Sequence, residues 1–316
     1  MAKFRLSLAE NHITTILFHR FFFPGEDAKV SRDRLRRQCE WLVETFNPVR
    51  LPELDCGLTN KLPSYPLLVT IDDAKIEVLH VLDIFRSFSI PVAIFACVGW
   101  CAQEETRIAD PRILLARLVA DIQWYRGPRT TIRVGEELLL IGDDMAAEDA
   151  IDKLLNYAAF NEIDPAELSP AVFETFRRKK VSCTLKELLE VQSHFVAIGG
   201  HSISHINLAT ASSVRLSFEI SETRRILRDV FGECTSFAYP YGMPNTFNSA
   251  TSRELAKAGF RSAFLSHSGF AGPDTDRLQI PRIALPDRGL SQPEFRARVA
   301  GAGVVYRKIK QTFGRS

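Results

Sequence analysis

The feature that most constrains the fold is a repeated alternation of short apolar runs with longer amphipathic segments. Five segments have the apolar period of helices, at residues 31–46, 75–88, 184–192, 214–231 and 252–259. Seven runs have the length and β-branched or aromatic content of buried strands, at residues 14–19, 67–71, 92–98, 195–200, 236–240, 262–266 and 279–285. Strands that alternate with helices form parallel sheets, so the pattern indicates an α/β protein. Seven such strands favour a barrel over an open sheet.

Local signals predict where two of these helices begin. Ser31 is expected to be the N-cap of the first helix, because its hydroxyl can accept a backbone hydrogen bond. Thr184 and Glu187 have the spacing of a capping box.

Residues 100–183 interrupt the alternation. They contain several helical patterns and a possible hairpin around residues 131–144. A loop of that length without secondary structure is improbable in a compact domain, so we expect a mostly helical insertion that caps one end of the barrel. The chain is then one domain, residues 1–316, with the insertion at 100–183 and a basic C-terminal helix at 288–316.

Charge and composition limit the partners. The net charge of +2 gives no case for nucleic acid. Polar residues break the apolar runs near the N-terminus, which predicts neither an export signal nor a membrane span and favours the cytoplasm. Six cysteines without a disulfide spacing predict reduced, buried thiols. The segment 288–316 has seven basic residues and one acid, which suits contact with an anionic membrane. The alternative, which we favour, is a solvated terminal helix that packs on the barrel.

Two adjacent acids, Asp72 and Asp73, end the strand-like run of "LLVTIDD". Capping of the following helix is one explanation for such a pair of like charges. The other explanation is a functional site, which needs further residues elsewhere in the chain. The segment "GGHSISH" supplies candidates: His201 and His205 are four residues apart and are expected to project from one face of a helical turn. Two histidines and one carboxylate make a three-ligand site with an open position, the arrangement of catalytic zinc.

A third element is "SFAYPYG", residues 236–242. It predicts a strand that ends in a rigid turn, with the backbone amide of Tyr241 directed into the same barrel mouth. The rings of Tyr239 and Tyr241 are expected to form a wall on which a sugar stacks. Taken alone, this sequence is also compatible with an ordinary turn.

Together, "TIDDA", "HSISH" and "FAYPYG" resemble, in order, the motifs of the NodB-like polysaccharide deacetylases, carbohydrate esterase family 4. The resemblance spans residues 14–285, with the insertion outside it. It implies a distorted (β/α)7-type barrel that holds a divalent metal, most often Zn²⁺. It also implies a hydrolase that removes an N-acetyl group from an amino sugar of a polysaccharide or glycan precursor.

The resemblance also implies roles for individual residues. Asp73, His201 and His205 would be the metal ligands, and Asp72 would be the general base that takes a proton from metal-activated water. The backbone N–H of Tyr241 would stabilise the oxyanion.

The sequence departs from the family pattern at two functional positions. Ala238 stands where the family has an arginine that orients the base, and we expect Arg282, in "QIPRIAL", to replace it. The usual late histidine that acts as general acid is missing. His19, in "ITTILFHR", resembles the N-terminal position of this motif in some exopolysaccharide deacetylases, and we favour it. His267 is the rival, with substrate binding as its alternative role.

Two other functions stay open at this point. The same hydrolytic chemistry suits an O-acyl or N-formyl sugar. A catalytically silent carbohydrate-binding protein is the other alternative, although such a protein would be expected to lose metal ligands. Under each hypothesis the partner is a sugar or glycan.

Overall fold

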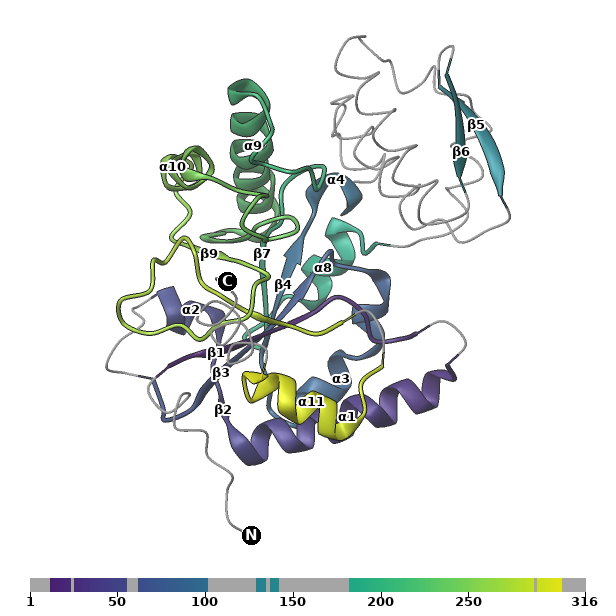
Figure 1. The fold of residues 1–316 in the computed structure, drawn as a ribbon, viewed down its shortest axis with the longest axis vertical. Helices are drawn as coiled ribbons and strands as arrows, with labels where there is room; N and C mark the ends of the chain where they lie inside the picture. The colour runs from purple at the N-terminus through teal and green to yellow at the C-terminus, as the bar shows by residue number, and fades with distance from the viewer. Residues whose placement is uncertain are drawn as a thin grey trace, which may run out of the picture.

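The computed structural model describes residues 12–23, 26–55, 62–101, 129–134, 137–141, 182–286 and 289–302. Its centre is a sheet of parallel strands in the order β10-β1-β3-β4-β7-β8-β9, with the short β2 beside β3 (Figure 1). The strands are β1 Thr14–Phe18, β2 Asn47–Pro48, β3 Pro66–Asp72, β4 Val92–Ala96, β7 Val196–Gly200, β8 Ser236–Ala238, β9 Ser262–Phe264 and β10 Ile283–Ala284. All seven predicted strands are confirmed, and β2 is additional.

The two edges of the sheet are joined by one segment, residues 280–284. At its start, Ile280 forms a parallel bridge with Phe264 at the end of β9. At its end, Ile283 pairs with Ile16 of β1. Because the same segment bonds to the first and the last strand, the sheet curls into the distorted barrel that the sequence resemblance implies.

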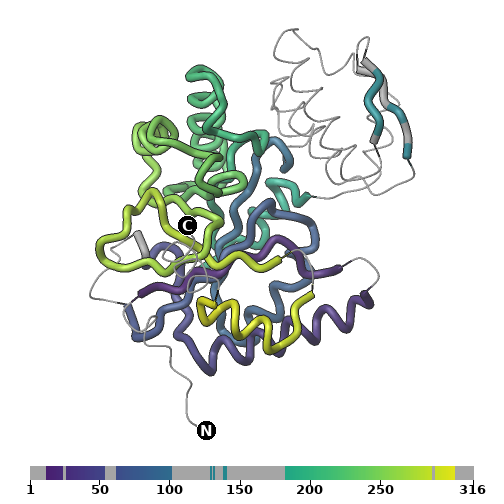
Figure 2. Tube along the Cα trace, in the orientation of Figure 1, coloured from purple at the N-terminus to yellow at the C-terminus, as the bar shows by residue number. Residues whose placement is uncertain are grey.

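Helices cover the outside of this barrel. The chain contains α1 Ala28–Thr45, α2 Leu51–Asp55, the 3₁₀ helix η2 Ile76–His80, α3 Leu82–Ser87, α4 Val98–Cys101, α8 Leu185–Val191, α9 Ser213–Phe231, α10 Ser249–Lys257 and α11 Gln292–Val299. Figure 2 shows α11, in yellow, along α1, in purple, although they come from opposite ends of the chain. With helices outside and side chains inside, β1, β3 and β4 are buried on both faces, which explains their continuous apolar sequences.

The period of two in β3 places its acid inside the barrel. Leu67, Val69 and Ile71 belong to the large core cluster between sheet and helices. Leu68 faces the smaller interior cluster. Successive side chains of a strand point to opposite faces, so Thr70 and Asp72 share the interior face with Leu68.

Two helix predictions were wrong in detail. Helix α1 begins at Ala28, and its N-cap is Asp27, whose carboxylate accepts from the amides of Lys29 and Val30 at 2.8 and 3.4 Å. Ser31 lies one turn inside the helix. The predicted helix 75–88 is divided at Val81 into η2 and α3. By contrast, the capping box of Thr184 and Glu187 is confirmed, with hydrogen bonds of 3.0 and 2.9 Å.

The insertion is described only in part. Strands β5 Thr130–Val134 and β6 Glu137–Ile141 form an antiparallel hairpin, as predicted. The predicted insertion helices lie outside the described residues, so the cap stays a prediction. The same holds for the basic C-terminal segment beyond α11 and Ala302.

Two further sequence predictions concern cysteines and membranes. The five cysteines in the described ranges are buried thiols, as predicted: Cys39, Cys97, Cys101, Cys183 and Cys234. In the same ranges, no helix has the length and apolar character needed to cross a membrane.

Candidate active site

Asp72 and Arg282 form a buried ion pair at the C-terminal end of β3. The two guanidinium Nη atoms donate to Oδ1 and Oδ2 of Asp72, both at 2.7 Å. Asp72 is 1% exposed and Arg282 is fully buried. This two-pronged geometry fixes the plane of the carboxylate as well as its position. It supports the expectation that Arg282 takes over the orientation of Asp72 from the missing motif arginine at Ala238.

Three strands hold Arg282 in place. Its Nε donates to the carbonyl of Leu265 at the end of β9, at 2.7 Å. One Nη also donates to the hydroxyl of Thr70 in β3, at 3.2 Å. Thr70 in turn donates to the carbonyl of Ile16 in β1, at 2.8 Å. Closure of the barrel between β9 and β1 is therefore what brings this arginine to Asp72.

Asp73, His201 and His205 meet beside this pair. Oδ1 of Asp73 lies 3.5 Å from Nε2 of His201 and 3.7 Å from Nε2 of His205. One potential ligand atom from each residue lies within 4.8 Å of the other two. Ligand atoms about 2.1 Å from one zinc ion are separated by about 3 to 4 Å. The three atoms of this cluster therefore need to approach one another only slightly to share a cation.

The hydrogen bonds around the cluster also fit a metal. Nδ1 of His201 lies 2.8 Å from the carbonyl of Ala238, which can only accept, so Nδ1 carries a proton and Nε2 is the nitrogen that would ligate a cation. Metal-binding histidines usually donate the N–H of their other ring nitrogen to a carbonyl or carboxylate oxygen. Oδ1 of Asp73 is buried without a hydrogen-bond partner. Since buried carboxylate oxygens are normally satisfied, this oxygen is suited to ligate a cation.

The electrostatic environment supports an ionised pair of acids and one neutral histidine. Burial opposes ionisation of Asp72, but the charges of Arg282 and His201 outweigh it and lower the pKa of Asp72. For Asp73, burial is likewise outweighed, chiefly by Lys75, and its pKa lies well below the usual value. Burial and the neighbouring His201 lower the pKa of His205 to about 3, which leaves its imidazole neutral.

The histidine pair does not lie on a helical turn, contrary to the sequence prediction. Residues 201–205 form an irregular loop after β7, in which Ser202 and His205 have φ values of 65° and 56°. The other motifs also contain left-handed residues: Asp73 at 71°, Ala74 at 49° and Tyr241 at 60°. Such conformations cost energy in non-glycine residues and cluster at functional sites, where surrounding contacts impose them.

Contacts with two neighbouring elements hold this loop. At the end of β4, the amides of Val98 and Gly99 donate to the carbonyls of Ser202 and Ile203 at 3.0 and 2.9 Å. From α9, the fully buried Glu219 accepts from the amides of Ile203 and Ser204, both at 2.9 Å.

Glu219 is a positioning residue that the sequence analysis missed. Its carboxylate also accepts from the hydroxyl of Ser204 and pairs with Arg215 at 2.7 Å. A signal was present in the sequence. Glu219 is the one acid in the apolar stripe of its helix, which contains Leu216, Ile220 and Leu227.

The two predicted tyrosines have different environments. Tyr241 is 49% exposed, and its ring lies 4.7 Å from that of His205, at the mouth of the site. Tyr239 is completely buried and donates to the carbonyl of Leu278 at 2.8 Å. The turn after β8 therefore places Tyr239 in the core, and not at the mouth where the sequence analysis expects it. Trp100, which the sequence analysis did not select, packs against the other side of His205 at 5.1 Å.

The two candidate acids differ in their relation to the cluster. His19, after β1, is close enough for its charge to contribute to the lowered pKa values of Asp72, Asp73 and His205. His267 follows β9, and its carbonyl accepts from the amide of Arg282 at 3.2 Å. The proximity of His19 to the cluster is compatible with the role expected for it.

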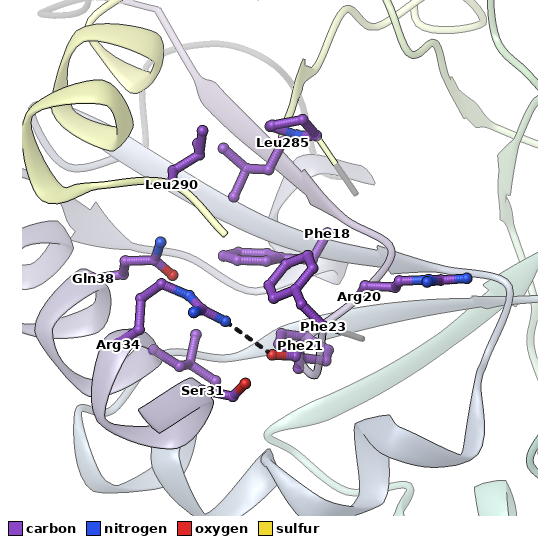
Figure 3. Close-up of a pocket in the computed structure, with 11 residues that line it drawn as sticks. Phe18, Arg20, Phe21, Phe23, Ser31, Arg34, Gln38, Leu285 and Leu290 are labelled. Carbon is purple, nitrogen blue, oxygen red and sulfur yellow. Dashed lines mark hydrogen bonds between the residues drawn. The ribbon is translucent and has the colours of Figure 1, made fainter. Parts of the chain in front are cut away.

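A separate cavity lies between the end of β1, the first half of α1 and the residues Leu285, Pro286 and Leu290 (Figure 3). Phe18, Phe21 and Leu290 line it, and Arg34 donates to the carbonyl of Phe21 at 3.3 Å. Its volume of about 20 Å³ has room for about one water molecule. It is too small for a sugar ring, so a glycan does not bind there.

The buried pair of Arg282 and Asp72 leads to a prediction about stability. Replacing Arg282 with Ala should lower the free energy of unfolding by about 3 to 5 kcal/mol, because it leaves a buried carboxylate without its partner. Urea unfolding measures this change. The matched control is Arg261→Ala, which removes an exposed pair with Glu233 of the same 2.8 Å length and should cost less than about 1 kcal/mol. Equal losses in the two variants would contradict the assignment.

Comparison with known proteins is consistent with this geometry. The family model for polysaccharide deacetylase matches residues 160–263, a segment that contains His201, His205 and Tyr241 and begins after Asp73. The sequence comparison with curated proteins gives no match.

Three solved structures have a similar fold. The Streptococcus pyogenes deacetylase PplD in complex with acetate is 14% identical, with a TM-score of 0.57 over 88% of this chain and 94% of that chain. IcaB from Ammonifex degensii is 16% identical, with a TM-score of 0.58 over 92% of this chain and 96% of that chain. The BpsB deacetylase domain from Bordetella bronchiseptica is 17% identical, with a TM-score of 0.53 over 88% of this chain and 96% of that chain. At these identities the likeness establishes the barrel fold. The family-model match over residues 160–263 and the three ordered motifs make the chain similar to the polysaccharide deacetylases, in agreement with the sequence resemblance.

Proposed function

We propose that the protein is a metal-dependent hydrolase that removes the N-acetyl group from an amino sugar of a glycan. One observation carries the proposal. A carboxylate fixed by Arg282, Asp72, lies beside a three-ligand cluster formed by Asp73, His201 and His205. Two acids adjacent in sequence therefore have separate partners and separate functions.

Asp73, His201 and His205 would hold the divalent cation. A cation bound there supplies Lewis acidity, which lowers the pKa of water and polarises a carbonyl group. Zn²⁺ agrees with one carboxylate and two imidazoles as ligands.

Asp72 is the general base of this proposal. Each of its oxygens accepts one hydrogen bond from Arg282, which leaves a second lone pair on each oxygen for a proton. Asp72 removes a proton from the attacking water while the new C–O bond forms at the acetyl carbon. Its lowered pKa keeps it ionised, and therefore able to accept that proton, at neutral pH.

Two groups act on the other atoms of the amide. The backbone N–H of Tyr241, held in a left-handed turn with φ of 60°, donates to the oxygen that becomes negative. His19 donates a proton to the nitrogen as the C–N bond breaks, so the products are acetate and a free amine.

The choice between His19 and His267 gives a second prediction. His19→Ala should lower kcat by about 100-fold or more, because the leaving amine then lacks its proton donor. His267→Ala is the matched control, with an expected loss below tenfold and an effect mainly on KM. Steady-state kinetics of both variants on the same substrate separates the roles. A large fall in kcat for His267→Ala alone would reverse the assignment.

The activity itself is tested by acyl release. The substrates are N-acetylglucosamine oligomers and a nucleotide-linked N-acetyl sugar, with O-acetyl and N-formyl sugars as the competing classes. Mass detection of the products should show loss of the N-acetyl group, and a chelator should stop it. The acetate in the PplD structure, which is the product expected of such a reaction, supports this choice.

Other outcomes assign the protein to other functions. Preferential loss of an O-acyl or formyl group would favour the corresponding deacylase. Tight metal binding with no acyl release from any glycan would favour a carbohydrate-binding protein. The cytoplasmic location stays a prediction, and membrane contact of the basic C-terminal segment stays the less favoured alternative.

A further inference from the structure

A buried lysine lies on the far side of the metal-ligand carboxylate. Lys75 is 5% exposed, and its Nζ lies 3.2 Å from Oδ2 of Asp73. The other oxygen, Oδ1, faces His201 and His205 at 3.5 and 3.7 Å. The two oxygens of Asp73 therefore have different neighbours, a cation on one side and two imidazoles on the other. The mechanism above gives Lys75 no role.

The backbone around Lys75 holds its ammonium group in this position. Lys75 forms an antiparallel bridge with Ser182. Its carbonyl accepts from the thiol of Cys183 at 3.5 Å, and the amide of Cys183 donates to Ala74 at 2.8 Å. Two residues further along, Glu77 accepts from the amide of Phe21 at 2.9 Å. The loop that carries Lys75 is thus tied to two other parts of the chain.

We propose that Lys75 is an internal counter-cation of Asp73, which turns Oδ1 toward the histidines and weakens the binding of a divalent cation. This inference rests on the proposed function, because it concerns the cation held by Asp73, His201 and His205.

The charges of the site give the physical reason. Each acid has its own positive partner, Arg282 for Asp72 and Lys75 for Asp73. A divalent cation would therefore enter a site in which both acids already have a positive partner. A cation held at Oδ1 would share one carboxylate with the ammonium group at Oδ2, in a buried environment where little water screens their repulsion.

Lys75 also contributes to the orientation of Asp73, so its removal has two opposing effects on affinity. Loss of orientation weakens binding. Loss of the positive charge strengthens binding. Because the repulsion involves a divalent ion at short range, we expect the charge effect to prevail.

The experiment measures the Kd for Zn²⁺ by competition with a chromophoric chelator, on the full chain. Lys75→Met has a similar shape without the charge, and its Kd should fall at least tenfold. Lys75→Arg keeps the charge, and its Kd should stay within threefold of the parent protein. Lys257→Met, which removes an exposed lysine paired with Glu254 at 3.4 Å, is the matched control and should leave Kd unchanged.

Thermal unfolding supplies a second measurement. Without metal, Lys75→Met should have a lower Tm than the parent protein, because Asp73 is then buried without a cation. Saturating Zn²⁺ should raise its Tm more than it raises that of the parent. If Lys75→Met does not fold without metal, Lys75→Gln replaces it, since Gln can still donate to Oδ2.

The outcomes distinguish this inference from the proposed function. An unchanged or higher Kd in the uncharged variants, with Zn²⁺ bound normally by the parent protein, overturns the role of Lys75 alone. A parent protein that binds no divalent cation overturns the metal-dependent function and this inference with it. A purely structural lysine predicts weaker Zn²⁺ binding in Lys75→Met, which is the opposite sign.

Discussion

Asp72→Asn is expected to keep the bound metal and to lose turnover by about 100-fold to 10,000-fold, the usual contribution of general acid-base catalysis. The amide cannot take a proton from water at neutral pH. The metal ligands are unchanged in this variant, because Asp72 contacts Arg282 through both oxygens and lies outside the three-ligand cluster. Steady-state kinetics and metal content of the same preparation measure the two properties.

A structural effect of this change has to be separated from the catalytic one. The asparagine leaves Arg282 with one fewer acceptor in a buried site, so the free energy of unfolding should also fall. The comparison is therefore made well below the Tm, on samples with the circular dichroism spectrum of the parent protein. Loss of metal in proportion to loss of turnover would contradict the division of roles.

Asp73→Ala is expected to have the second large effect, loss of the metal itself. The change removes one of three ligands and leaves the ammonium group of Lys75 buried beside the site, where it repels a cation. Replacing a residue that only contacts a metal ligand typically lowers metal affinity by about 10-fold to 100-fold. Because Asp73 would be a ligand itself, we expect the affinity for Zn²⁺ to fall by at least about 100-fold.

Metal content after dialysis and the competition assay both measure this loss. Asp72→Asn is the control, since it changes the adjacent acid and should keep the metal. Asp229→Ala, at an exposed acid on α9, checks for non-specific effects. Stoichiometric Zn²⁺ in Asp73→Ala would show that this acid is not a ligand and would return the pair to the helix-capping explanation.

The strands were predictable from local sequence because they are buried on both faces. A strand such as β4, with every residue buried, must be apolar throughout, and its sequence shows this directly. The motif residues Asp72, Asp73, His201 and His205 were predictable for a related reason. They follow immediately after such strands, and the ends of parallel strands meet at one mouth of a barrel.

The conformation of the histidine loop was not predictable from spacing. A separation of four residues suggested a helical turn, but the amides of α4 and the carboxylate of Glu219 bond to this loop and impose left-handed residues. Contacts from distant segments outweighed the local pattern. Tyr239 shows the same limit, since its buried hydroxyl donates to Leu278, 39 residues along the chain, whereas the ring of Tyr241 is exposed.

The sequence by itself determined the parallel α/β architecture, the three candidate ligand residues and the expectation that Arg282 orients Asp72. Only the tertiary structure decided which charges meet. The fork between Arg282 and Asp72 joins residues 210 positions apart, and it forms because the segment 280–284 bonds to both β9 and β1. The pairing of Lys75 with one oxygen of Asp73 likewise depends on a left-handed turn that no local pattern encodes. Coulomb interactions depend on distance in space, and barrel closure sets that distance.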